Sequence, residues 1–146
     1  MDAREERSLA AGLFNRTWEL FDARASDDEL IHTAHASAYH WAQVGTAANR
    51  ARGEWLCARV YSVLGRAEPA LHHARRCLEL VETHRDEMDD WDLPAAYEAV
   101  ARAELLAGDR EAAERAVEAG RSACAAIAEE EDRLPIERDL DSLALA

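Results

Sequence analysis

The sequence predicts an all-helical domain in which about six helices form antiparallel hairpins and a shorter helix caps the C-terminal end. The composition supports this, because alanine, leucine, glutamate and arginine dominate the 146 residues and only six glycines and three prolines interrupt them. Apolar residues recur three and four positions apart, whereas alternating β-branched runs are missing. The length suits one domain, residues 1–146, with a core of its own.

The first predicted hairpin spans residues 3–45. Its first helix is amphipathic, and its second begins at the capping-box pair of Ser26 and Glu29, in which the serine oxygen accepts from the third amide. Gly45 is expected to end the second helix in the left-handed conformation, after which Thr46 can cap the next helix.

Two further hairpins and a tail complete the predicted chain. The hairpins span residues 47–88 and 92–129, each with a turn glycine, Gly65 and Gly108. Residues 134–146 keep apolar side chains at helical spacing and are predicted as a short capping helix. A stack of this kind satisfies the rule that one hairpin cannot bury its own apolar face, and a plain up-and-down bundle is the competing architecture.

An internal repeat becomes visible when the two turn glycines are superposed. Ala58 and Ala101 both lie seven residues before their glycine, and Ala70 and Ala113 both lie five residues after it. Small side chains at these positions are needed where two helices approach closely. The two hairpins are therefore expected to share one packing arrangement.

This arrangement resembles the tetratricopeptide repeat. The small residue, the turn glycine and the second-helix alanine match twice, and Tyr61 and Tyr97 each supply one of the two expected aromatics. The closing proline of that family is absent, where Glu82 and Ala125 stand, and the glycines are 43 residues apart instead of about 34. The resemblance covers residues 53–128 and implies a right-handed solenoid of hairpins that acts by holding other proteins.

Charge and cysteine usage limit the possible partners and compartment. A formal net charge of −13 repels phosphate backbones and anionic membrane surfaces, so neither nucleic acid nor a membrane is expected as a partner. Cys57, Cys77 and Cys124 are scattered and odd in number, which argues against a disulfide framework. The charged N-terminal segment lacks the apolar core of a signal peptide, and a cytoplasmic protein is expected.

The candidate binding residues lie at helical spacing along the first helices of the two later hairpins: Asn49, Arg52, Trp55, Arg59, Ser62, Glu98 and Arg102. By the resemblance, these helices line a concave groove. Arginines beside an aromatic ring can hold a carboxylate by forked hydrogen bonds, which implies an acidic or C-terminal peptide as the ligand. The alternative is that the arginines pair with nearby glutamates and that Trp55 is packing.

A second candidate site is a group of histidines on the predicted second helix. His32 and His35 lie three positions apart and could share a face as metal ligands, with further ligands from another helix, such as His72 or His73. Tyr39 follows on the same helix. The alternative is that these imidazoles line a seam between helices.

Sequence patterns of catalysis are absent. The acidic run of residues 86–92 lacks the central glycine of a calcium loop and is predicted as a solvated connection. Cys57 and Cys77 are expected to be buried and inert. We therefore expect a non-enzymatic scaffold without a cofactor, which binds a protein or peptide partner; the alternatives are a metal- or small-molecule-binding domain that uses His32 and His35, and a self-associating homodimer.

Overall fold

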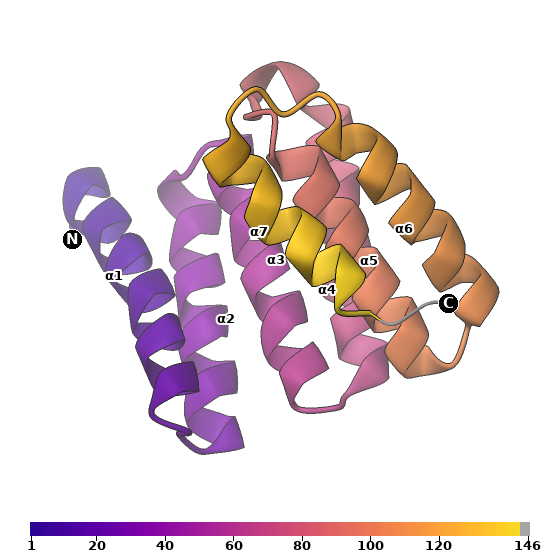
Figure 1. Cartoon of the computed structure of the whole chain (residues 1–146). Coiled ribbons are helices and arrows are strands. Elements are labelled where there is room, and N and C mark those ends of the chain that lie inside the picture. Colours follow the sequence, from indigo (N-terminus) through magenta and orange to yellow (C-terminus); the bar gives the residue numbers. More distant parts are fainter. Residues whose placement is uncertain (144–146) are drawn as a thin grey trace.

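The computed structural model describes residues 1–143, and this part of the chain contains seven α-helices, a short 3-10 helix and no strand (Figure 1). The helices are α1 (Ala3–Asp22), α2 (Asp27–Val44), α3 (Ala47–Val63), α4 (Ala67–Thr83), η1 (Arg85–Glu87), α5 (Asp92–Ala107), α6 (Arg110–Cys124) and α7 (Glu130–Asp141). The predicted all-helical class is confirmed. Residues 144–146, the end of the predicted capping tail, lie outside the described residues.

The helices pack in the order in which they occur. Helices α1 and α2, α3 and α4, and α5 and α6 form three antiparallel pairs, and α2 against α3 and α4 against α5 join each pair to the next. In Figure 1 the pairs follow one another from indigo to orange, and α7, in yellow, lies across the front of the later helices. Helix α7 contacts α5 and α6. This sequential packing is that of stacked helical hairpins.

The turn of the first hairpin has the same backbone conformation as the other two. Gly65 and Gly108 have φ angles of 74° and 88°, as left-handed helix ends require, and Arg24 takes the equivalent place with φ 52°. Seven residues before Arg24 stands Thr17, which is fully buried like Ala58 and Ala101. The three turns are thus 41 and 43 residues apart, and the N-terminal helix pair repeats the arrangement of the later hairpins.

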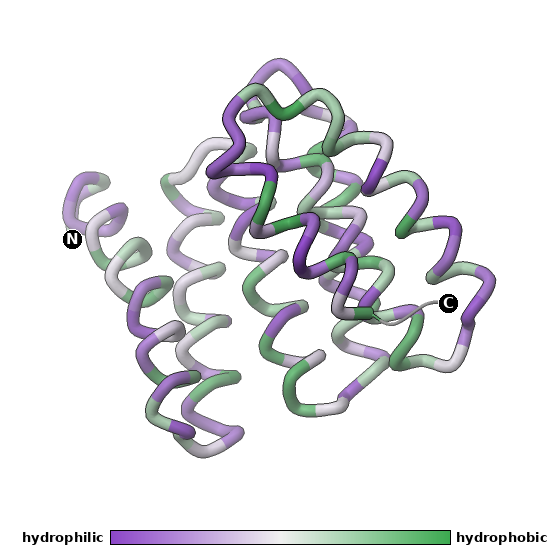
Figure 2. The backbone as a smooth tube through the Cα atoms, in the orientation of Figure 1, coloured by the Kyte–Doolittle hydropathy of each residue, from purple (hydrophilic) through white to green (hydrophobic). Residues whose placement is uncertain are grey.

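Small side chains dominate the seams between hairpins. Ala58, Ala70, Ala74 and Ala103 are almost fully buried together, and residues of this size allow the helix backbones to approach closely. At Gly53, an added Cβ would lie 3.3 Å from the backbone of α2. Figure 2 shows hydrophobic positions recurring along each helix between hydrophilic ones. None of the described helices has the length and hydropathy that crossing a bilayer requires.

Gly45 does not take the predicted left-handed conformation. Its φ and ψ angles are −86° and 166°, because the chain leaves α2 in an extended conformation and enters the cap of α3, where Thr46 accepts from the third amide. The glycine is required for space, since a Cβ would lie 2.6 Å from the carbonyl oxygen of Trp41. The predicted cap at Ser26 is present, with its hydroxyl oxygen accepting from the amide of Glu29 at 3.2 Å.

The boundaries of the last two helices also differ from prediction. Helix α6 ends at Cys124 instead of about residue 129, because the chain turns there to bury Ile127, and the amide of Ala128 donates to Asp90 at 3.0 Å. Helix α7 begins at Glu130, four residues before the predicted start. Three acidic residues lie in its first turn, where negative charge interacts favourably with the helix dipole. The helix therefore starts before Pro135.

We expect opposite effects on stability from substitutions at the left-handed turn positions. Arg24→Gly should raise the free energy of unfolding by about 0.5 kcal/mol, because relief of the left-handed strain exceeds the entropy that glycine adds to the unfolded chain. Gly65→Ala should lower it by about 1 kcal/mol. Urea unfolding followed by circular dichroism measures both changes.

Arg50→Gly is the matched control, because Arg50 is equally exposed but lies within α3, where glycine costs about 1 kcal/mol. Destabilisation of the Arg24→Gly variant by a similar amount would contradict the shared turn conformation.

Candidate functional site

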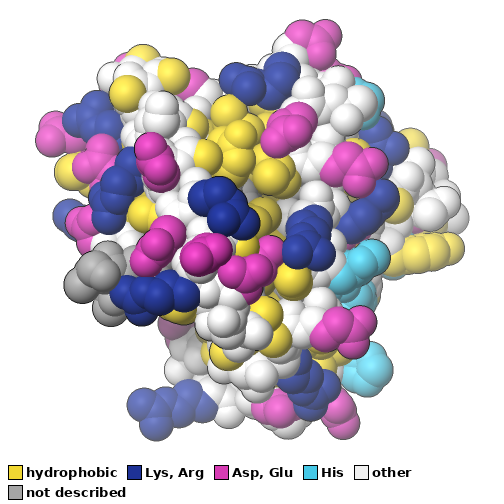
Figure 3. Space-filling model, turned by 90° about the vertical axis from the view of Figure 1, so that its right-hand side faces the viewer, with side chains coloured by type: hydrophobic (Ala, Val, Ile, Leu, Met, Phe, Trp, Pro, Cys, Tyr) yellow, Lys and Arg dark blue, Asp and Glu magenta, His cyan; other side chains and the backbone are white. Residues whose placement is uncertain are grey.

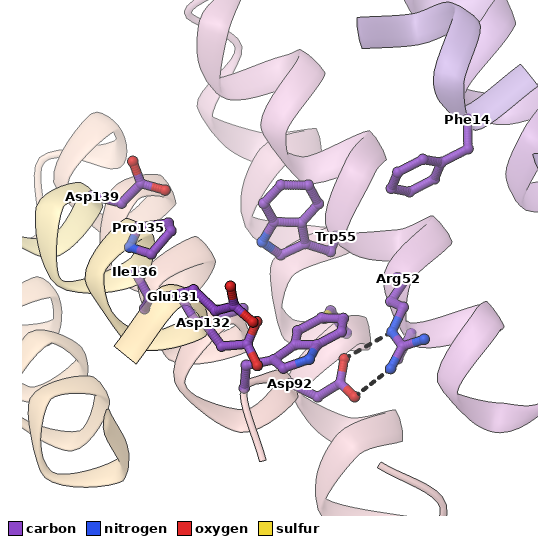
Figure 4. A pocket seen from close by; sticks show the side chains of 13 residues that line it. Phe14, Arg52, Trp55, Asp92, Glu131, Asp132, Pro135, Ile136 and Asp139 are labelled. Carbon is purple, nitrogen blue, oxygen red and sulfur yellow. Dashed lines mark hydrogen bonds and ion pairs between the residues drawn. The ribbon is translucent and has the colours of Figure 1, made fainter. Parts of the chain in front are cut away.

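An apolar hollow in the described chain lies between α1, α3, the start of α5, and α7, and we call it the groove. It has a volume of about 320 Å³. Figure 4 shows Trp55 in its middle, Phe14 on the α1 side and Pro135 and Ile136 on the α7 side. Trp91, at the N-cap of α5, also lines it. The groove therefore combines side chains from helices that are far apart in the sequence.

Aromatic side chains form much of the groove wall. Trp55 packs against Trp18 of α1, with ring centroids 5.8 Å apart, and Trp18 remains more than one third exposed. Phe14, Trp55 and Trp91 are each half-buried. Large rings that keep exposed surface in a hollow of this size are available for contact with a ligand.

Arg52 is held by carboxylates of its own chain. Its Nε and Nη2 donate to the two oxygens of Asp92 at 3.0 and 2.8 Å (Figure 4). Nη2 also donates to Asp89 at 2.9 Å. The guanidinium lies 4.4 Å from the centre of the Trp91 ring. The hydrogen bond to Asp92 is the main cause that raises the pKa of Arg52 above its ordinary value. The forked contact expected for a ligand carboxylate is thus already made with Asp92.

An ionic cluster beside the groove surrounds the buried carboxylate of Glu98, and its other members are Arg59, Arg102 and Asp139. The side chain of Glu98 is 2 % exposed, and it accepts from Arg59 Nη2 at 3.3 Å and from Arg102 Nε at 2.8 Å. Arg59 Nη2 also donates to Asp139 of α7 at 3.1 Å. The cluster connects α3, α5 and α7. A reversed charge at position 59 would face two carboxylates and disturb the packing of all three helices.

The predicted binding residues are thus divided between several roles. Arg52 and Trp55 line the groove, whereas Arg59, Glu98 and Arg102 form the ionic cluster. The amide oxygen of Asn49 accepts from the backbone amide of Thr46 and completes the cap of α3.

Ser62 lines a separate shallow hollow near the end of α3. The arginines pair with carboxylates of the same chain, but Arg52 and Arg59 do so across helices instead of with glutamates of their own helix. Binding of a partner by these residues stays a prediction.

Residues of α7 form the part of the site that sequence reasoning missed. Glu131, Asp132 and Ile136 line the groove, although only a capping role was expected for this segment. The apolar spacing of Ile136, Leu140 and Leu143 predicted a helix. That spacing contains no information about which face of the stack the helix covers, so the location of α7 could come only from the structure.

The charged residues that line the groove are predominantly acidic. Among the described residues, its charged members are Asp92, Glu131, Asp132, Asp139 and Arg52. Asp92 balances Arg52, and Asp139 pairs with Arg59. Within the described part of the chain, Glu131 and Asp132 have no ion-pair partner, and in Figure 4 both carboxylates extend from α7 toward the middle of the groove. The unbalanced charge in the groove is therefore negative.

The histidines on α2 are arranged differently from a metal site. His35 Nε2 shares a hydrogen bond of 2.9 Å with the hydroxyl of Tyr61, and the ring of His35 lies 5.1 Å from that of His73, centroid to centroid. His73 Nδ1 donates to Glu54 of α3 at 2.6 Å. The structure thus brings His35 and His73 together across α2 and α4, as the candidate metal site would require, but their ring nitrogens bond to Tyr61 and Glu54.

Burial and neighbouring charges shift the pKa values of His35 and Glu54, which lie where α2, α3 and α4 meet. Burial first, and then the charge of His73, lower the pKa of His35 below 6.5. Burial alone would raise the pKa of Glu54, but its hydrogen bond to His73 and the charge of His73 outweigh burial and lower that pKa below 4.5.

His32 and Tyr39, the other members of the proposed site, are exposed. Among the described residues, no three His, Cys, Asp or Glu side chains are grouped as metal ligands.

The three cysteines are buried and free, as expected for Cys57 and Cys77. Burial raises the pKa of the Cys57 thiol to about 12, and it raises the pKa values of Cys77 and Cys124 as well. All three thiols are therefore protonated at neutral pH, which makes them poor nucleophiles.

The face on the α6 side carries mixed charges and some exposed hydrophobic side chains. Figure 3 shows arginines and carboxylates interspersed over this face, with imidazoles near one edge. No large area of one charge stands out in that view.

Comparison of the chain with protein families, curated proteins and solved structures finds no match. The proposed function therefore rests on the geometry of the groove.

We expect stability to fall as the pH is lowered from 7 to 5. The unfolded chain protonates His35 near pH 6.5, whereas the folded chain resists protonation until a lower pH, so acid favours the unfolded state. The contribution of Glu54 is present above about pH 4.5 and is lost in more acidic solution. Urea unfolding at pH 7, 6 and 5 measures the trend, and His35→Gln should reduce its slope.

His84→Gln is the control, because His84 ends α4 outside this seam. A slope that changes equally in both variants would contradict the assignment to His35.

Proposed function

We propose that the protein is a non-enzymatic, tetratricopeptide-like scaffold whose groove binds a segment of a partner protein. The observation that carries this proposal is the groove itself, an apolar hollow of about 320 Å³ with three partly exposed aromatic side chains. Hollows of this size and lining are typical of ligand sites. Three stacked hairpins with left-handed turns support the tetratricopeptide-like part of the proposal.

The ionic contacts around the groove favour binding without rearrangement. Arg52 connects α3 to the start of α5, and Arg59 connects α3 to α5 and α7. Side chains that are already ordered lose little conformational entropy when a ligand binds. A groove held in this way can bind a segment with modest contact area.

The chemistry of the groove supports binding more than catalysis. Its one arginine already donates from Nε and Nη2 to Asp92 and Asp89, and Cys77, which also lines the groove, has a protonated thiol. Covalent catalysis needs an activated nucleophile, which a protonated thiol does not provide. The metal-binding alternative at His35 is less well supported, because a ring nitrogen of His35 already bonds to Tyr61.

Filling the groove tests the proposal. Ala95 lines the groove from α5, so Ala95→Leu should occupy space there while the helix and the ionic cluster remain intact. Phage-displayed random dodecapeptides are first selected on the wild-type protein. We expect the selected peptides to bind Ala95→Leu at least about tenfold more weakly, because the apolar contact surface is lost.

Ala107→Leu is the matched control, because Ala107 ends the same helix and is exposed. It should bind the peptides as the wild type does. Selection of no peptide, or equal binding by the Ala95→Leu variant, would contradict the proposal.

A further inference from the structure

The charge of the groove is opposite to what a ligand carboxylate needs. Every arginine that the sequence places near the groove is paired: Arg52 with Asp92, and Arg59 and Arg102 with Glu98. An incoming carboxylate would have to displace one of these intramolecular contacts. It would also approach the unpaired carboxylates of Glu131 and Asp132, at a cost in repulsion.

Aromatic rings and free carboxylates together define a site for a cation. Trp55 and Trp91 offer partly exposed ring surface, and each ring already attracts one cation of its own chain. Arg59 lies 5.1 Å from the centre of the Trp55 ring, and Arg52 lies 4.4 Å from that of Trp91. Cations are attracted to such ring faces, more strongly where water is excluded. Glu131 and Asp132 then supply negative charge at the α7 side of the same hollow.

The groove continues into a second hollow, which favours an extended ligand over a small free amine. The second hollow has a volume of about 150 Å³, and it shares Phe14 and Arg52 with the groove. Its other lining residues include Trp41 of α2 and Asn49 of α3. A peptide that places one side chain in the groove can therefore place a neighbouring residue in the adjoining hollow.

We infer that the partner segment carries a basic side chain, lysine or arginine, which enters the groove with its apolar stem against Trp55 and its charge beside Glu131 and Asp132. This inference rests on the proposed function and assigns the chemistry of the ligand. The stems of both basic residues pack readily on apolar surface while the charged end stays near water or a counterion. The net charge of −13 also accelerates the approach of a basic partner.

The experiment uses three synthetic peptide arrays that differ at one position. Each array has the same randomised uncharged flanks, and the central residue is lysine, methionine or glutamate. Fluorescently labelled protein should be retained by the lysine array about tenfold more than by the methionine array, because methionine offers a similar stem without the charge. The glutamate array should retain none above background.

Variants of α7 locate the preference in the groove. Glu131→Gln combined with Asp132→Asn should remove most of the lysine preference. Glu129→Gln combined with Glu130→Gln removes the same charge from the same end of α7, but neither residue lines the groove, and the preference should persist. Loss of the preference in both double variants would overturn the inference, because the effect would then come from overall charge.

Other outcomes separate this inference from the proposed function. Equal retention by the lysine and methionine arrays, or greater retention by the glutamate array, overturns the inference that the ligand carries a basic side chain. The scaffold proposal still stands in that case if the Ala95→Leu variant no longer binds the retained peptides. Retention by no array, together with failed phage selection, overturns both. If n-butylammonium shifts the indole NMR signals of Trp55 and Trp91 while no array retains the protein, the groove binds a free amine. The inference that the cation belongs to a peptide is then overturned.

Discussion

The buried carboxylate of Glu98 is the contact on which the arrangement around the groove depends. An ionised carboxylate excluded from water is costly unless opposite charges and hydrogen bonds compensate it. Arg59 from α3 and Arg102 from α5 do so, and Arg59 extends the cluster to Asp139 of α7. Three helices separated in the sequence are thereby required to meet at one place. Most of the side chains that line the groove belong to the same three helices, and Phe14 is added from α1.

Because of these contacts, Arg52 and Arg59, which lie at helical spacing on α3, are not free to bind a ligand carboxylate. Arginines at helical spacing beside a tryptophan can hold a ligand carboxylate, but here each guanidinium is bound within the chain. The unpaired charges in the groove are instead the carboxylates of Glu131 and Asp132 on α7, on the opposite side of the groove from α3. The ligand chemistry therefore follows from the residues that remain unpaired, and these favour a cation beside aromatic rings.

Local patterns account for the features that could be predicted from sequence. Apolar spacing identified the helices, and Ser26 and Thr46 capped them as expected because a cap depends on neighbouring residues only. Gly65 and Gly108 identified two turns. The third turn was hidden, because Arg24 occupies a position where glycine is the usual signal.

The candidate site was less accessible to sequence reasoning, because it depends on contacts between distant segments. Trp55 and Arg52 line the groove, whereas their helical spacing indicated only that they share one face of a helix. The partners of the arginines were not specified, since Asp92 lies 40 residues from Arg52 and Asp139 lies 80 residues from Arg59. Many carboxylates in the chain could pair with an arginine, and the packing of the helices determines which of them comes close enough to do so.

A double-mutant cycle between Arg59 and Glu98 tests most directly whether the ionic cluster holds these helices together. The free energy of unfolding is measured for the wild type, Arg59→Met, Glu98→Gln and the double variant. The two substitutions should be strongly non-additive, with a coupling energy of about 2 kcal/mol, because each removes the partner of the other. Additivity within about 0.5 kcal/mol would contradict the account, since the two side chains would then contribute independently.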